Sequence, residues 1–332
     1  MSTGLLTRTK EAFWGLLDPW AFLSLSASFL PQTIRHIFAS HPPLSGLRIL
    51  LLSPSRFREA WFGQFWGRVG PQVRETAGQR VLPLLDGRTS RGRVTDHPTG
   101  PGVGGVVVEI GAGSGLWVDV FSDRHLWQQD RDRDQDHPRG GTGGGSEKRD
   151  NTARTEITRV YGVEPNHAHH PALRRAVEDA GLKDVYEIVP VGIEDLSSSS
   201  PSSSSGEEGK TKNEKKWDGN IEPESVDCIV SVLCLCSIPD PERHIRELYA
   251  LLRPGGRWYV YEHVRCEYSW YIRLYQRVVN LVWPHFIGGC ELCRPTEKSL
   301  REAGQWASID IGHPAEEMWY HILPHILGVL TK

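Results

Sequence analysis

The feature that most constrains the fold is a glycine-rich turn after an apolar strand, in the stretch VVVEIGAGSG from Val106 to Gly115. Glycine adopts backbone conformations that other residues avoid, so this chain can turn sharply and let a ligand approach its main chain closely. The spacing G-x-G-x-G differs from the G-x-G-x-x-G of dinucleotide binders, and no Lys-Ser/Thr pair follows that would indicate a P-loop. The stretch predicts a strand, a ligand-binding turn and a helix beginning at Leu116.

Strands and helices alternate around and beyond this turn. Apolar strand patterns cover residues 106–110, 159–163, 186–189, 227–233 and 257–262, with weaker final strands near 307–311 and 326–330. Helical patterns cover residues 167–180, 241–252, 268–282 and 297–303. This alternation predicts an α/β fold with a doubly wound, mostly parallel, seven-stranded Rossmann-like sheet.

Carboxylates stand at three strand ends, where open α/β sheets bind ligands. Glu109 precedes the first glycine and suits a ligand with an ammonium group, such as the methionine part of S-adenosylmethionine. Glu164 suits the two ribose hydroxyls, and Glu194 suits the adenine amino group. The cofactor site is expected to comprise Glu109, Gly111, Ala112, Gly113, Gly115, Glu164, Asn166, Ile193, Glu194 and Leu233.

The expected domain occupies residues 101–332, and two insertions interrupt it. Residues 123–155 are charged and glycine-rich, and residues 197–220 hold a serine tract and a mixed-charge run. Neither can bury enough apolar surface to offset its ordering entropy, so both are predicted to be disordered surface insertions.

Residues 1–100 are expected to form a helical N-terminal segment. Residues 19–34 carry no charge, but this run is too short and too polar to span a bilayer. Apolar faces with basic flanks favour either a lid packed on the main domain or contact with a membrane surface. Aromatic residues repeat at helical spacing over 56–69, and Gly70-Pro71 is expected to end that helix.

The overall composition narrows the function classes. A net charge of −3 and the lack of a basic stripe with aromatics argue against a nucleic-acid partner. Six cysteines without a signal peptide favour a reducing intracellular compartment, either cytoplasmic or peripherally attached to an intracellular membrane. The oligomeric state is not indicated.

The run from Val226 to Val264 resembles the methyltransferase-like protein 7 family of thiol S-methyltransferases. The segment Leu235-Cys236-Ser237, the Glu262-His263 pair and the Gly-Cys at Cys290 carry the resemblance beyond the general cofactor motifs. It implies a class I methyltransferase fold, S-adenosylmethionine as cofactor, and a small hydrophobic thiol or related acceptor. Transfer to an oxygen or carbon of a small metabolite is the alternative, and nucleic-acid methylation a more remote one.

Two side chains are candidates for the catalytic step. A thiol with a pKa near 8.5 needs modest help to ionise, and His263 at a strand tip could act as its general base. Cys236 could line the acceptor site. A zinc site of Cys234, Cys236, Cys290 and Cys293 is disfavoured, because the first pair has C-x-C spacing at a core strand, so no metal is predicted.

Overall fold

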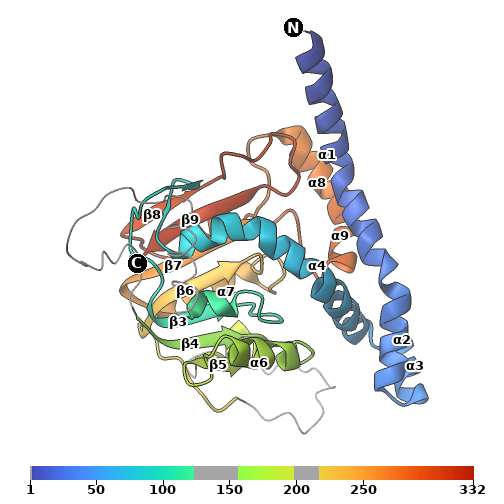
Figure 1. The fold of residues 1–332 in the computed structure, drawn as a ribbon, viewed down its shortest axis with the longest axis horizontal. Coiled ribbons are helices and arrows are strands. Elements are labelled where there is room, and N and C mark those ends of the chain that lie inside the picture. The colour runs from blue at the N-terminus through green and yellow to red at the C-terminus, as the bar shows by residue number, and fades with distance from the viewer. Residues whose placement is uncertain (1, 123–155, 198–216) are drawn as a thin grey trace, which may run out of the picture.

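The computed structural model describes residues 2–122, 156–197 and 217–332. A seven-stranded sheet forms the centre, with helices on both faces and a group of helices at one edge (Figure 1). The expected insertions lie mostly outside the described residues.

The sheet has the strand order β5-β4-β3-β6-β7-β9-β8. β3, β4, β5, β6 and β7 pair in parallel, and β9 pairs antiparallel with both β7 and β8. The prediction of a doubly wound, mostly parallel sheet is confirmed. The strands are β3 (Gly105–Ile110), β4 (Ile157–Val163), β5 (Tyr186–Val189), β6 (Val226–Val232), β7 (Leu252–His263), β8 (Ser308–Gly312) and β9 (His325–Thr331).

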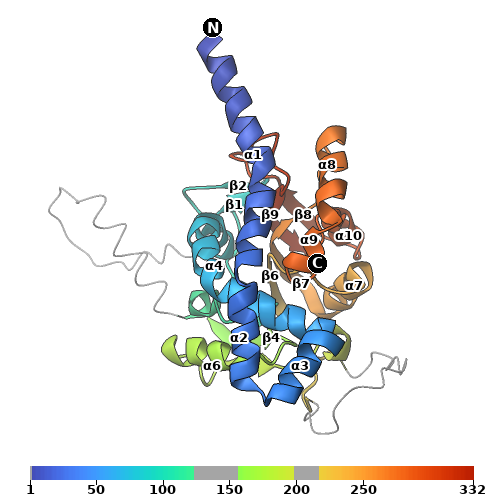
Figure 2. The ribbon, with the colours of Figure 1, turned by 90° about the vertical axis from the view of Figure 1, so that its right-hand side faces the viewer.

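Alternate residues of the buried strands supply two separate cores. Val108 and Val260 pack against α7 (Pro241–Leu251) and α10 (Thr296–Arg301) on one face. Val107 and Tyr259 pack against α4 (Pro54–Leu85) and α6 (His170–Asp179) on the other. Because both faces are covered, central strands such as β3 and β6 are mostly apolar on both sides, as expected for a buried parallel sheet. Figure 2 shows α4 and α7 on opposite sides of the sheet.

The helix α4 runs through Gly70-Pro71, so the expected end there is wrong. Proline lacks an N–H and crowds the carbonyl four residues earlier, which here belongs to Gly67. Gly67 and Pro71 are both exposed, so water can bond the freed carbonyl. The apolar face continues beyond the proline through Ala77 and Val81, and this packing on the sheet holds the helix together.

The helix expected from Leu116 is also wrong over the described residues. Only a short 3-10 helix, η1 (Val118–Phe121), follows the glycine turn before the described part ends at Ser122. A small hairpin of β1 (Thr89–Ser90) and β2 (Arg93–Val94) links α4 to the sheet region.

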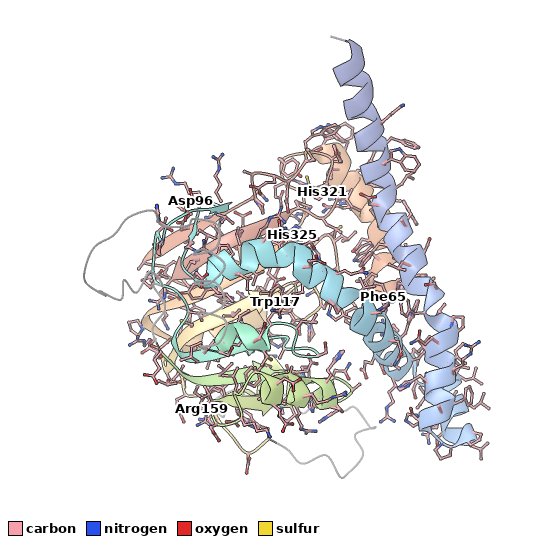
Figure 3. The ribbon with its side chains drawn as sticks, viewed as in Figure 1. Phe65, Asp96, Trp117, Arg159, His321 and His325 are labelled. Atoms are coloured by element: carbon pink, nitrogen blue, oxygen red, sulfur yellow. The ribbon has the colours of Figure 1, made fainter. Side chains whose placement is uncertain are left out.

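Helices from both ends of the chain form a third core at the carboxyl edge of the parallel strands. The N-terminal helices are α1 (Ser2–Ser28), α2 (Leu30–Ser40) and α3 (Pro43–Leu52). Leu23 of α1 packs there with α4, α8 (Trp270–Asn280) and α9 (Trp283–Phe286). Phe65 of α4 is fully buried against Phe22 and Phe29 (Figure 3). Among the described helices, none is long and apolar enough to cross a bilayer.

Candidate active site

The glycine turn after β3 has left-handed backbone at all three glycines, but the three differ in the space around them. A Cβ on Gly111 would lie 2.6 Å from Cys234 Cβ, and one on Gly115 would lie 2.6 Å from Ala176 Cβ. A Cβ on Gly113 would meet no heavy atom nearer than 3.8 Å. Gly111 and Gly115 therefore permit close packing within the protein, while Gly113 has open space above it.

Glu164 joins the tip of β4 to this turn. Its Oε2 accepts the Gly113 N–H and its Oε1 accepts the Asn166 N–H, both at 2.8 Å. The side chain is 7% exposed, and burial raises the pKa of the carboxyl although both N–H donors lower it. Three of the predicted cofactor residues are thus connected directly by hydrogen bonds.

Glu109 lies beneath the turn and is directed into the protein. It accepts a hydrogen bond from the Tyr186 hydroxyl of β5 and is 3% exposed. Burial raises its pKa to about 7, the Tyr186 bond opposes that rise, and the charge of Glu164 adds to it. Glu109 thus links β3 to β5, and its expected role toward a ligand ammonium stays a prediction.

The residues expected near the adenine follow β5 in the short helix η2 (Ile193–Asp195). Ile193 is buried in the core beside α7, and Ala112 is buried below the turn. Glu194 is exposed, with an oxygen 3.8 Å from His244 Nε2 of α7. Glu194 therefore lies at the same sheet edge as Glu164, as predicted, and its side chain is exposed to solvent.

The loop after β6 is held from two sides by charged side chains. Leu233 has left-handed backbone (φ 54°), a conformation that costs a non-glycine residue about 1–3 kcal/mol. The fully buried Glu262 accepts the N–H groups of Cys234 and Leu235, each at 3.1 Å. Arg294 donates to the carbonyl oxygens of Leu235, at 3.0 Å, and Ile238.

Glu262 and Arg294 were missed as site residues by the sequence reasoning. The Glu262-His263 pair was noticed only through the family resemblance. Nothing in the sequence shows that a carboxylate on β7 bonds main-chain groups of a loop 28 positions earlier. Burial raises the pKa of Glu262 to about 7, against the lowering effect of the two N–H bonds.

The two predicted catalytic residues lie together in the third core. His263 ends β7 and Cys236 lies in the loop after β6, and both are buried. His263 Nε2 is 3.0 Å from Cys290 Sγ, which also accepts the Trp283 indole N–H at 3.2 Å. Burial is the largest single effect on the pKa of His263 and lowers it, but the interactions with Cys236 and the charge of Glu262 together raise it, and the net direction is upward.

The four-cysteine set considered above does not assemble. Cys234 donates to Glu262, and Cys293 is half-buried outside the cluster. Cys236 and Cys290 instead meet His263, and their ligand atoms all lie within 4.8 Å of one another.

Comparisons with known proteins identify the family of this chain. A family model described as "Methyltransferase domain" matches residues 93–311. Thiol S-methyltransferase TMT1A of Homo sapiens is 38% identical over 109 residues, which cover 32% of this chain and 44% of that protein. Thiol S-methyltransferase TMT1B of Rattus norvegicus is 34% identical over 109 residues, with the same coverage. The match thus spans less than half the length of these relatives.

The chain is also similar to a solved structure, an S-adenosylmethionine-dependent methyltransferase from Mesorhizobium loti. It is 16% identical and covers 70% of this chain and 93% of its own, with a TM-score of 0.39.

Proposed function

Because the chain belongs to the methyltransferase-domain family, with S-adenosylmethionine as its methyl donor, we propose that it transfers a methyl group to a small-molecule thiol. The observation that carries the thiol assignment is the buried His263 beside Cys236. The ring nitrogen Nδ1 of His263 has no hydrogen-bond partner among the described residues. A buried imidazole with an unpaired nitrogen can take a proton from an acceptor that enters beside it.

The residues around the glycine turn fit the cofactor. Gly113 presents open space and an accessible main chain, and Glu164 lies beside it with its carboxylate oxygens at the sheet edge. We propose that Glu164 and Asn166 hold the ribose, that the turn holds the methionine part, and that Ile193, Glu194 and Leu233 flank the adenine. When bound, S-adenosylmethionine supplies an activated methyl group, so the protein chiefly has to orient the acceptor and exclude water.

The environment of His263 excludes water. The third core surrounds it with apolar side chains from α1, α4, α8 and α9. His263 acts as the base that makes the acceptor thiolate, and Cys236 forms one side of the acceptor site. An apolar enclosure of this kind favours a hydrophobic thiol over a charged acceptor.

A donor-dependent assay tests this function. Labelled S-adenosylmethionine is supplied with matched sets of thiols, phenols and amines, and we expect methylation of the thiols. His263→Gln should lower the turnover number while leaving affinity for S-adenosylhomocysteine near normal, and turnover should recover at high pH where the thiol ionises unaided. Methylation of phenols or amines alone would replace the thiol assignment by the alternative acceptors.

The lid and the membrane surface were expected as alternatives for the N-terminal segment; we also propose that it combines them, as a lid on its inner side and a membrane-contacting surface on its outer side. Its inner side packs on the third core through Leu23. Its outer side, together with α8, exposes large apolar side chains. They include Phe13, Trp14, Trp20, Trp270, Leu274 and Leu281. Trp20 Nε1 donates to Tyr275 Oη at 2.8 Å, so α1 and α8 lie side by side and their exposed residues form one surface.

Vesicle co-sedimentation tests the membrane contact. We expect the full chain to bind phosphatidylcholine vesicles and the double variant Trp14→Glu/Trp270→Glu to lose most binding. Val94→Glu, at an exposed apolar position on β2, is the matched control. Equal binding by the two variants would assign the segment to the lid role alone.

A further inference from the structure

Three soft ligand atoms from three separate parts of the chain meet in the third core. Cys236 comes from the loop after β6, His263 from the end of β7, and Cys290 from the turn after α9. The two sulfurs and the ring nitrogen all lie within 4.8 Å of one another, and all three side chains are buried. Because the three residues come from three separate segments, no single loop positions the whole cluster.

In this cluster one sulfur has two nitrogen neighbours, and one ring nitrogen has no partner among the described residues. Cys290 Sγ faces His263 Nε2 and the Trp283 N–H, so one sulfur has two nitrogen neighbours within hydrogen-bonding distance. His263 Nδ1 has no partner among the described residues although the ring is only 6% exposed. An unpaired buried nitrogen is unfavourable whichever tautomer is present. The two sulfurs and the ring nitrogen therefore form a compact set of soft donor atoms, which is the composition of a metal site.

We propose that Cys236, His263 and Cys290 bind a Zn²⁺ ion. Two thiolates and an imidazole suit zinc and exclude the oxygen-seeking ions magnesium and calcium. Tetrahedral zinc with Zn–S near 2.3 Å and Zn–N near 2.0 Å requires ligand atoms about 3.5–3.8 Å apart. His263 Nε2 and Cys290 Sγ lie 3.0 Å apart and all three ligand atoms lie within 4.8 Å of one another, so side-chain adjustments of up to about 1 Å give this spacing.

The ion would keep one open coordination position. Among the described residues, no fourth cysteine, histidine or carboxylate joins the cluster. Three protein ligands with one open position are the pattern of catalytic rather than structural zinc. Cys236 and His263 both stand at the carboxyl ends of parallel strands, where this fold binds its ligands.

The use of the open position rests on the proposed thiol acceptor. The acceptor binds zinc through sulfur: its S–H bond breaks, an S–Zn bond forms, and the proton leaves to bulk water. In the zinc-bound protein His263 is a ligand, and the ion rather than the free imidazole produces the thiolate. The metal site itself does not depend on the identity of the acceptor.

Metal content of the full chain, purified under reducing conditions and then given zinc, tests the site directly. We expect about one zinc per chain, and at least a tenfold loss of zinc affinity in Cys236→Ser and Cys290→Ser. Cys293→Ser is the matched control, since that cysteine lies three residues from Cys290 but outside the cluster. Thermal unfolding of each variant without metal shows whether the fold persists. Zinc affinity that is equal in wild type and in the Cys236→Ser/Cys290→Ser double variant would overturn the proposal.

Cobalt substitution tests the open position without any methyl transfer. Co²⁺ bound to the cluster should show thiolate-to-cobalt charge-transfer bands, and butanethiol should change them while butanol should not. Thiol methylation by fully zinc-free protein, at the rate of the zinc-loaded form, would refute the zinc role and leave the proposed function intact. Tight zinc binding without thiol methylation would leave the metal site intact and refute the proposed function.

Discussion

Replacement of Glu164 by alanine probes the connection between the cofactor and the glycine turn. The carboxylate accepts two main-chain N–H groups at 2.8 Å in a nearly buried position. Hydrogen bonds to a charged group contribute about 1.5–3 kcal/mol each when well formed. In the variant, water at the strand tip can replace part of the lost hydrogen bonding to the two N–H groups, so we expect Glu164→Ala to lower the free energy of unfolding by about 1–3 kcal/mol.

Glu164→Ala should also weaken cofactor binding by at least a similar free energy. Loss of the ribose contacts, together with a looser turn at Gly113, should weaken S-adenosylmethionine binding by about 2–3 kcal/mol, which is roughly 30- to 150-fold. Calorimetry with S-adenosylhomocysteine measures the affinity, and urea titration measures the stability. Glu178→Ala serves as control, because Glu178 pairs with Lys183 at the surface of α6. Affinity within about a factor of two of wild type, below the tenfold that 1.4 kcal/mol gives, would remove Glu164 from the cofactor site.

Two further predictions come from the site. Gly115→Ala should destabilise the fold by about 1–3 kcal/mol, because its Cβ would lie 2.6 Å from Ala176 Cβ at a left-handed φ of 85°. Gly113→Ala should lower the free energy of unfolding by about 1–2 kcal/mol through backbone strain alone. It should weaken S-adenosylhomocysteine binding more than Gly115→Ala does. Thermal melts compare the stabilities and calorimetry the affinities; equal affinity losses would contradict the assignment of Gly113 to the cofactor. Burial raises the pKa of Glu262 from 4.5 to about 7, so the folded state binds more protons than the unfolded state between these values. The free energy of unfolding should therefore fall as pH rises from about 4.5 to about 7, by up to roughly 3 kcal/mol from this group, and urea titrations of wild type and Glu262→Gln should differ in that slope.

Much of the fold could be predicted because its signals are local. The apolar runs of β3, β4 and β6 and the glycine turn appear in short windows of sequence, and their alternation with helices predicts a parallel, doubly wound sheet. The methyltransferase family indicated by the resemblance of Val226–Val264 and the cofactor S-adenosylmethionine are confirmed. Glu164 was placed at the turn correctly, because the carboxyl ends of neighbouring parallel strands meet at one edge.

The errors and omissions have a different physical origin. Helix α4 passes Gly70-Pro71 because packing on the sheet outweighs a local breaking signal, and that packing is not visible within α4's own sequence. The bond between Glu109 and Tyr186, 77 positions apart, joins two strands and leaves no trace in either local sequence. Arg294 donates to the carbonyl oxygen of Leu235, and Cys290 lies near Cys236; both partners are more than 50 positions earlier in the chain. Periodicity carries no information about such contacts.

The position of β9 has a consequence for how this protein is made. β8 precedes β9 in the chain, yet among the described strands β8 pairs with β9 only, and β9 also pairs with the long strand β7. While the ribosome is still adding residues before His325, the edge of β7 stays open and residues 308–312 have no strand to join. Open edges of this kind recruit strands from other chains. Nascent chains stalled in this interval should therefore be the ones that engage chaperones, and a fusion that hinders β9 should reduce yield more than one placed before α1.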